Sequence, residues 1–385
     1  MASPAFSADL PPGTTPADEI DPATGLARSS VVKPLLGPGG EAAPSPDAPA
    51  TARPAAAAEP AAPPPRPHIA LILPTLSPAL GPVAEAVRQG FLAAAAVAGK
   101  EALPVQVTAT DNEGDALLAA CRKAQAAGAL VVVAGLTRDG ATSLAASDCP
   151  RQPLLALNEP KGDLLPTVYV TSLSLEQEAR LAALAAVNDG FHKAVVIHTP
   201  STLSRRVEEA FTREWTRAGG EVHRIQYTGS PEEPAGLRER IAASRPDMVF
   251  VAMNDAETRD VRPYISAMLP LYATSMSVNP RAEPVVNVDL EGVRYWEMPW
   301  FAQPDHPAVM AYPPPRTPLP LEQERLYAFG IDAFRLALAI VKGDPAKAPL
   351  DGVTGKLVLE GRTFARTPMP AEVDGGRVIP LRTTP

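Results

Sequence analysis

The apolar residues of this chain fall into short runs that alternate with helical patterns, and this alternation begins at His68. Residues 69–73 form an apolar run that ends at Pro74, which predicts a buried strand. Val83, Val87 and Phe91 then recur at helical spacing, and glycine at position 99 ends the expected helix. A second strand is expected at residues 105–109, so the pattern changes from strand to helix and back within one short stretch.

The same strand and helix unit recurs along the chain and predicts two successive series. In the first series the further expected helices are 115–127 and 138–146, and the further expected strands are 130–133 and 154–157. The second series starts after residues 168–172; its expected helices are 175–187, 203–218 and 237–243, and its expected strands are 194–197, 222–227, 248–252 and 271–274. Alternation of this kind implies right-handed crossovers and parallel sheets covered on both faces. We therefore expect an α/β fold of two doubly wound parallel-sheet lobes.

Proline content and periodicity together predict where the domains begin and end. Many of the 46 prolines lie in the first 67 residues, which show no helical or strand period. A long amphipathic helix near the end is expected to return to the first lobe. The predicted organisation is a disordered Pro/Ala-rich linker (1–67), lobe 1 (68–170, with return helix 321–343), lobe 2 (171–300), a Pro-rich loop (301–320), and C-terminal strands and tail (344–385).

Residues 288–300 contain two of the three tryptophans, Trp296 and Trp300. Residues 293–298 alternate in a way that is typical of a strand, and Pro299 ends it. A tryptophan buries a large apolar area while its indole N–H still needs a partner, so this cluster marks a core corner or a contact surface. We expect Arg294, Trp296 and Trp300 to lie at a hinge or to face a partner, and we favour bracing of the hinge.

Composition and missing motifs exclude several functions. The net charge of −8 and the isoelectric point near 5.3 argue against a nucleic-acid partner. No apolar run is long enough to span a bilayer. The five histidines are dispersed, and the motifs of nucleophile elbows, phosphate loops and dinucleotide-binding turns are missing. We therefore expect no enzyme, no metal site and no cofactor.

Open parallel sheets bind ligands beyond the carboxyl ends of their strands, so the polar residues that follow each strand are the candidates for a small polar ligand. Each of them taken alone is more typical of a helix cap or a turn. The candidates are Thr75, Asp111, Thr137, Arg138, Asn158, Ser172, Thr199, Asn254, Asp255 and Ser275.

Two cysteines, Cys121 and Cys149, fall in the first lobe, on or beside helices expected to be neighbours. In an exported protein they could form a disulfide, whereas two buried free thiols fit the sequence equally well. Neither lies in a Cys-x-x-Cys motif. No cysteine precedes Cys121, so an outer-membrane lipid anchor would require an upstream signal and lipobox cysteine.

Two stretches of the chain are distinctive, DLEGVR at 289–294 and LYATS at 271–275. Further informative stretches are 69–74, 86–91, 155–158, 298–300 and 325–336. Over residues 68 to about 365 the chain resembles a type I periplasmic binding protein, and more closely the C-terminal domain of the LppC family.

This resemblance implies a periplasmic, outer-membrane-associated regulator of peptidoglycan synthesis whose partner is a class A penicillin-binding protein. Better known members of the family carry a helical-repeat domain ahead of this one, where this chain has its Pro/Ala-rich segment. The alternative is a periplasmic solute-binding protein for an amino acid or a similar small polar ligand, held by hydroxyl and amide groups in the cleft.

Overall fold

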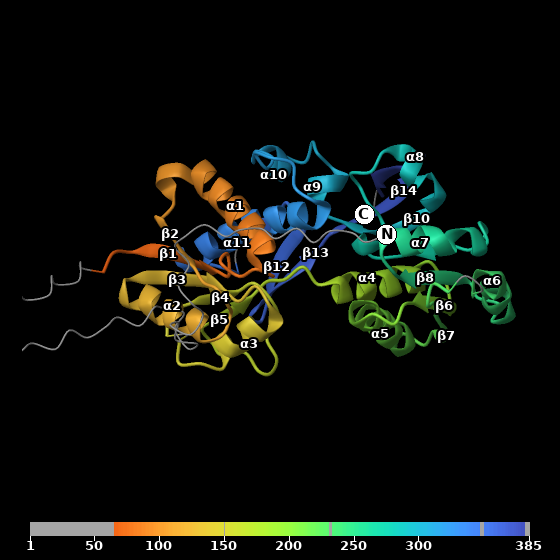
Figure 1. Cartoon of the computed structure of the whole chain (residues 1–385), viewed down its shortest axis with the longest axis horizontal. Coiled ribbons are helices and arrows are strands. Elements are labelled where there is room, and N and C mark those ends of the chain that lie inside the picture. The colour runs from red at the N-terminus through yellow and green to blue at the C-terminus, as the bar shows by residue number, and fades with distance from the viewer. Residues whose placement is uncertain (1–64, 150, 231–232, 347–349, 382–385) are drawn as a thin grey trace, which may run out of the picture. The chain divides into compact units, whose positions relative to one another are not determined.

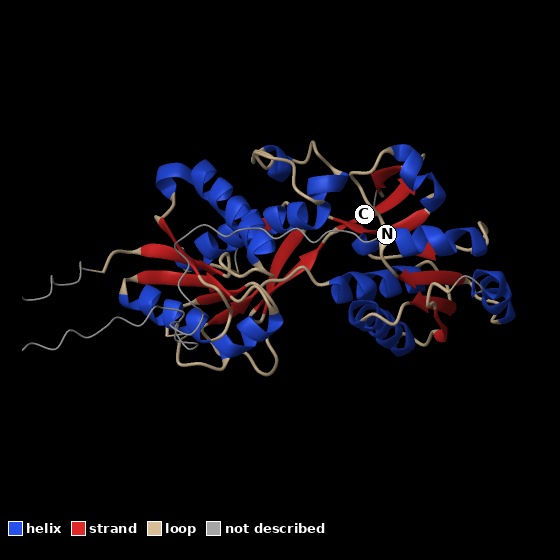
Figure 2. Ribbon diagram, viewed as in Figure 1, coloured by secondary structure: helices blue, strands red, loops and turns tan. Residues whose placement is uncertain are grey.

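The computed structural model describes residues 65–149, 151–230, 233–346 and 350–381. Residues 1–64 of the predicted linker (1–67) lie outside the described residues. The described chain forms two sheets, each dominated by parallel strands and covered by helices on both faces (Figures 1 and 2). The predicted α/β fold of two doubly wound lobes is confirmed.

The sheet of the first lobe has the strand order β11-β12-β13-β5-β4-β3-β1-β2. Its parallel strands come from the first predicted series: β1 (His68–Leu73), β2 (Val105–Ala109), β3 (Ala129–Ala134), β4 (Leu154–Ala156) and β5 (Val168–Val170). All six residues of β1 are buried, because helices cover both faces of the sheet. Helices α2 (Asp115–Ala126) and α3 (Arg138–Ala145) pack on one face, and α1 (Gly81–Ala98) and α11 (Leu321–Val341) pack on the other.

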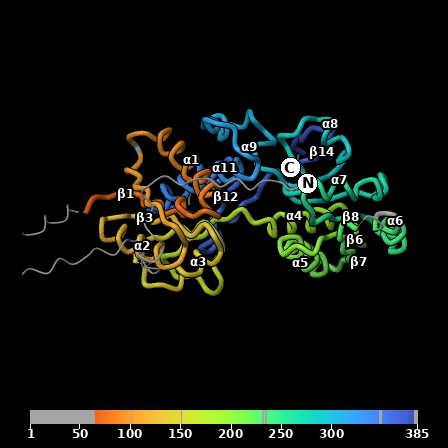
Figure 3. The backbone as a smooth tube through the Cα atoms, in the orientation of Figure 1, coloured from red at the N-terminus to blue at the C-terminus, as the bar shows by residue number. Residues whose placement is uncertain are grey.

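Helix α11 returns to the first lobe and packs closely on α1, although more than 200 residues separate them (Figure 3). The contact depends on two glycines. A Cβ atom at Gly90 would lie 1.8 Å from the backbone oxygen of Tyr327, and a Cβ at Gly330 would lie 2.2 Å from that of Val87. Phe91 and Phe334 meet edge to face beside this crossing, with ring centroids 5.3 Å apart.

The C-terminal strands divide between the two lobes. Strands β11 (Leu350–Asp351), β12 (Lys356–Glu360) and β13 (Thr363–Thr367) extend the first sheet at β5 through the pairing of Thr363 with Val170. Strands β14 (Met369–Asp374) and β15 (Arg377–Pro380) pair antiparallel beside β10 (Val293–Glu297) in the second sheet. This division could not be predicted from local patterns, because long-range pairing decides which lobe receives each short strand.

The sheet of the second lobe has the strand order β15-β14-β10-β9-β8-β6-β7. Its remaining strands are β6 (Lys193–His198), β7 (Glu221–Gln226), β8 (Met248–Ala252) and β9 (Leu271–Tyr272). Its helices are α4 (Leu175–Asn188), α5 (Thr202–Arg217), α6 (Glu233–Ala243), α7 (Asp255–Val261) and α8 (Pro284–Asn287). The strand expected at 271–274 is shorter than predicted, because a 3₁₀ turn at Ser275–Ser277 follows it.

In the described part of the chain, three segments connect the lobes. Residues 171–174 join β5 to α4, Met298 joins β10 to α9 (Pro299–Ala302), and Pro368 joins β13 to β14. The loop that follows α9 contains α10 (Pro307–Met310) and leads to α11. Among the described residues, every change of lobe therefore occurs at one of these three crossings. The groups around the crossings thus determine how the lobes are held together.

Cys121 of α2 and Cys149 form a disulfide with a Cα–Cα distance of 6.2 Å. The sequence left a disulfide and two free thiols open, and the structure contains the disulfide. Both residues are buried in the cluster beneath α2 and α3. The bond fixes the segment after α3 to α2, on the face of the sheet opposite α11.

Candidate functional site

Three of the residues predicted for the cleft come together between the lobes. Arg138, Asn158 and Ser172 line a cavity of about 200 Å³. The second lobe contributes Glu176 and Arg206 to the same cavity. Leu326 and Phe329 of α11 also line it. The carboxyl ends of β4 and β5 thus open into the space that the strand rule predicted.

The polar groups of this cavity are largely bonded to one another or to the backbone. The Asn158 amide donates to the Leu136 carbonyl at 3.0 Å, and its oxygen accepts from the Glu159 amide at 2.9 Å. The Ser172 hydroxyl donates to Glu159 at 3.2 Å. A ligand in this cavity would have to compete with these bonds for the same donors and acceptors.

Two arginines bring charge to the mouth of the cavity. Arg206 contacts the Glu176 carboxylate at 2.6 Å, and Arg138 reaches it across the cleft at 3.7 Å. Burial raises the pKa of Glu176, but its own backbone amide and the Arg206 guanidinium outweigh that effect, so the pKa lies below the ordinary value. The carboxylate is therefore ionised at neutral pH and links the two lobes through Arg138.

The cavity is small for a ligand site. Pockets that hold small molecules usually measure about 300–1,000 Å³, whereas this cavity has about 200 Å³. Its interlobe position is that of a solute-binding cleft, but its volume and its internal hydrogen bonds leave room only for a very small ligand in this conformation.

Four of the other predicted cleft residues have local roles. Thr137 caps α3 by accepting from the Gly140 amide, and Asn254 caps α7 in a capping box with Glu257. Asp255 pairs with Arg259 one turn along α7 at 3.1 Å. Thr75 lies in the turn after β1, where its amide donates to the Leu73 carbonyl.

The remaining three lie outside this cavity as well. Asp111 is exposed and accepts a hydrogen bond from Asn112. Thr199 is buried after β6, and its amide donates to the Ser204 hydroxyl at 2.7 Å. Ser275 is also buried, but it belongs to the crossing between the lobes.

A buried ion pair joins the lobes at the second crossing. Glu297, the last residue of β10, accepts two hydrogen bonds from Arg325 of α11, at 2.6 and 2.9 Å. Both side chains are almost inaccessible to solvent. Burial raises the pKa of Glu297 although Arg325 opposes the shift. The Arg325 guanidinium also lies 5.1 Å from the centre of the Phe301 ring, within the range of a cation–π contact.

A second buried pair joins the lobes beside the first. Glu178 of α4 contacts Arg366 of β13 at 2.7 Å, and both are buried. The other Glu178 oxygen accepts from the Ser275 amide at 2.9 Å, while the Ser275 carbonyl accepts from Arg325 at 3.1 Å. The two ion pairs therefore form one connected network through Ser275.

Both tryptophans of the 288–300 segment are buried at this crossing, a position that favours the bracing role over a partner surface. Trp300 is 5% exposed, and its indole N–H donates to Glu324 at 2.9 Å. Trp296 is 8% exposed and packs in the core beneath α4 and α5. Because both faces of β10 are covered, Trp296 is buried as well as its neighbour Tyr295.

Arg294 holds together parts of the second lobe rather than the two lobes. Its guanidinium reaches Asp189 at 3.3 Å and Glu372 of β14 at 3.4 Å. It also contacts the hydroxyl of Tyr272, which donates to Asp189. Burial and the bond to Asp189 raise the pKa of Tyr272 to about 12. Arg294 remains accessible enough to contact a partner as well.

Sequence reasoning missed the four charged residues of the buried network: Glu178, Glu297, Arg325 and Arg366. A partial signal exists for Arg325, which lies on a mostly apolar face of the return helix, although Asp332 is buried on the same face. The described residues contain no cluster of histidine, cysteine, aspartate and glutamate that could hold a metal ion. Among the same residues, no helix is both long and apolar enough to cross a membrane.

Comparison with known families and curated proteins gives consistent matches. The family model described as "LppC putative lipoprotein" matches residues 64–244 and 236–366. The penicillin-binding protein activator LpoA of Edwardsiella piscicida is 28% identical over 318 residues, which cover 71% of this chain and 46% of the relative. The chain thus spans about half the length of the curated relatives it matches.

Two solved structures are similar over most of the chain. A protein of Chromobacterium violaceum, described as a putative branched-chain amino acid ABC transporter, is 36% identical with a TM-score of 0.68, covering 80% of this chain and 100% of that chain. The LpoA C-domain of Haemophilus influenzae, described as a regulator of PBP1A, is 23% identical with a TM-score of 0.67, covering 82% and 100%. At that lower identity the second structure supports the fold alone.

Proposed function

The chain belongs to the LppC family, and on that premise we propose that it is a non-enzymatic regulator that activates a class A penicillin-binding protein. It would act in the periplasm, at the inner side of the outer membrane. The names of its curated relatives support this proposal, since they are called penicillin-binding protein activators.

The proposal rests on two buried ion pairs between the lobes, Glu297 with Arg325 and Glu178 with Arg366. A protein that captures a solute must open and close about its crossings. Opening here would separate Glu297 from Arg325 and Glu178 from Arg366, leaving charges uncompensated in the protein interior. Such a connection favours a molecule that presents one fixed surface, as a regulator that works by contact would.

The small cavity supports the same reading. Its polar groups are bonded internally, and Arg138 and Glu176 bridge its mouth. An activator does not need a ligand in this position. A regulator also needs no catalytic pair, and the sequence offers no nucleophile with a neighbouring base.

The proposal is tested by titrating the purified chain into the class A penicillin-binding protein of the same cell and measuring glycan polymerisation from lipid II. We expect the rate to rise with the chain and to saturate, with no product when the synthase is left out. A rate that does not respond to the chain would contradict activation. Product formed by the chain alone would contradict a non-enzymatic role.

A second candidate is a periplasmic solute-binding protein, favoured by the 36% identity to the protein described as a putative branched-chain amino acid ABC transporter. The cleft residues Arg138, Asn158 and Ser172 could then hold an amino acid. Thermal unfolding against a panel of amino acids and muropeptides separates the two candidates, because a bound ligand raises the midpoint with its concentration. The activator proposal expects no such rise with any of these compounds.

A further inference from the structure

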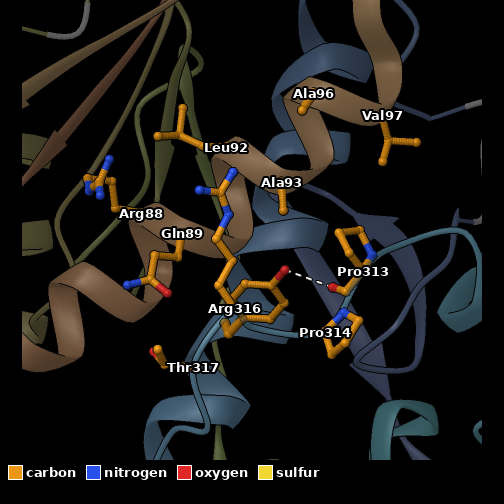
Figure 4. Close-up of a pocket in the computed structure, with 11 residues that line it drawn as sticks. Arg88, Gln89, Leu92, Ala93, Ala96, Val97, Pro313, Pro314, Arg316 and Thr317 are labelled. Carbon is orange, nitrogen blue, oxygen red and sulfur yellow. Dashed lines mark hydrogen bonds between the residues drawn. The ribbon is translucent and has the colours of Figure 1, made fainter.

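A larger groove lies on the first lobe, away from the cleft between the lobes. It has a volume of about 770 Å³ and runs between α1 and the Pro-rich loop that precedes α11. Figure 4 shows Arg88, Leu92 and Val97 along the helix, with Pro313, Pro314 and Arg316 across from them. The volume falls within the usual range for ligand pockets, about 300–1,000 Å³.

The walls of the groove are fixed before any partner binds. The Tyr327 hydroxyl donates to the Pro313 carbonyl at 2.8 Å and ties the loop to α11. The close contact of α1 with α11 at Gly90 holds the other wall. Prolines occupy positions 313–315, 318 and 320, so this loop has little conformational freedom to lose on binding.

The groove is also continuous with the crossing between the lobes. Tyr327 lines the groove, and its ring lies 5.7 Å from that of Trp300, centroid to centroid. Trp300 in turn bonds Glu324 on the same helix as Arg325. A partner seated in the groove would therefore contact the element that carries the buried ion pair.

The charge of the groove is opposite to that of the whole chain. None of the described residues that line it is acidic, although the chain carries a net charge of −8. Arg88 is balanced by Glu85, which it contacts at 2.6 Å. Arg316 is exposed, and within the described part of the chain no carboxylate pairs with it. Arg316 is thus an unbalanced positive charge at the groove.

The helix side of the groove is apolar and accessible. Val97 is 52% exposed, and Ala93 and Ala96 leave space beside it. Small side chains allow a bound segment to approach the helix backbone closely. A matching partner would place a carboxylate on Arg316 and small apolar side chains over this strip.

We propose that this groove binds an extended segment of a partner protein in which a glutamate or aspartate neighbours small apolar residues. The inference rests on the proposed function for the source of that segment, which we assign to the penicillin-binding protein. It does not use the cleft between the lobes. The peptide chemistry follows from the groove alone.

The direct test uses fluorescence anisotropy with the full chain and two labelled peptides. In one peptide glutamate alternates with alanine and valine, and in the other lysine replaces every glutamate. We expect the glutamate peptide to bind in preference, Arg316→Glu to abolish that preference, and Val97→Asp to weaken binding at least about tenfold. Matched controls are Arg213→Glu on an exposed part of α5 and Val285→Asp at an exposed position of α8, which should bind as the parent does.

The groove is not a site for an acidic segment if the chain binds both peptides equally or binds neither. The same conclusion follows if the two control variants lose as much affinity as the groove variants. A second arm measures binding of the parent chain and Arg316→Glu to the purified penicillin-binding protein. If the synthase binds both chains equally, the groove is not its site, although the proposed function stands. If the glutamate peptide binds as expected and the synthase binds neither chain, the proposed function fails while the chemistry of the groove stands.

Discussion

Arg325 and Glu297 form a bidentate ion pair across the boundary between the lobes, with nitrogen–oxygen distances of 2.6 and 2.9 Å and almost no exposure of either side chain. The pair lies where β10 leaves the second lobe and where α11 begins in the first. Because it is linked to Glu178 and Arg366 through Ser275, it is the centre of the connection between the lobes.

Replacing Arg325 with methionine should leave Glu297 buried without its cation. We expect the free energy of unfolding to fall by about 3–5 kcal/mol, the usual cost of removing one partner of a buried pair. Urea unfolding followed by circular dichroism measures this change. The matched double variant, Arg325→Met with Glu297→Met, should recover much of the loss, because it leaves no buried carboxylate without its cation. A single variant as stable as the parent would show that the pair does not hold the lobes together.

Replacing Trp300 with alanine should destabilise the fold by roughly 3–5 kcal/mol, because a buried aromatic side chain is lost and a cavity remains. Trp300→Phe should cost less, since it keeps most of the packing on Tyr327 but loses the hydrogen bond to Glu324. The exposed Val285→Ala serves as the control and should change stability by less than about 0.5 kcal/mol. Little effect of Trp300→Ala would argue for a partner contact instead of a bracing role.

Removing the disulfide by Cys121→Ala with Cys149→Ala should lower the free energy of unfolding by roughly 3–4 kcal/mol on the chain-entropy model. The two cysteines are 28 residues apart, which sets the size of the loop that is released. Thermal unfolding with and without a reducing agent measures the change. The reducing agent should lower the midpoint of the parent and leave the double variant unaffected. Equal midpoints for parent and variant would mean that the bond contributes no stability.

Glu176 should make the connection across the cleft sensitive to acid. Its folded-state pKa lies below the ordinary value of 4.5, so its ionised form stabilises the fold above pH 4.5. That contribution is lost as the pH falls through the folded-state pKa. The difference in unfolding free energy between the parent and Glu176→Gln should therefore shrink as the pH falls below 4.5. A difference that stays constant down to pH 3 would contradict this role.

Local pattern predicted most of the parallel core. The helix expected at 175–187 is α4 (Leu175–Asn188), and the strand ended by Pro299 is β10. These elements have continuous apolar patterns, and capping residues lie close to their ends in the sequence, such as Ser174 at the start of α4. Of the predicted cleft residues, Arg138, Asn158 and Ser172 meet in one cavity, because they follow the neighbouring strands β3, β4 and β5.

The buried network could not be predicted in the same way. Glu297 and Arg325 are 28 residues apart, and Glu178 and Arg366 are 188 residues apart, so no local spacing connects them. The sequence places Arg325 on a mostly apolar helix face, but only the packing of α11 against the crossing decides which carboxylate it meets. Thr137 and Asn254 show why the position after a strand does not by itself predict a cleft residue. A polar residue at that position can instead cap the next helix, as these two do.

Under the proposed function, the chain acts through a fixed surface and not through a ligand in the cleft. The most direct measurement is the rate of glycan polymerisation by the class A penicillin-binding protein with the parent chain and with a cleft variant, Arg138→Ala combined with Arg206→Ala. Both chains should activate the synthase to the same extent, with or without added amino acids. Loss of activation in the cleft variant, or activation that requires an amino acid, would show that the chain acts through the cleft.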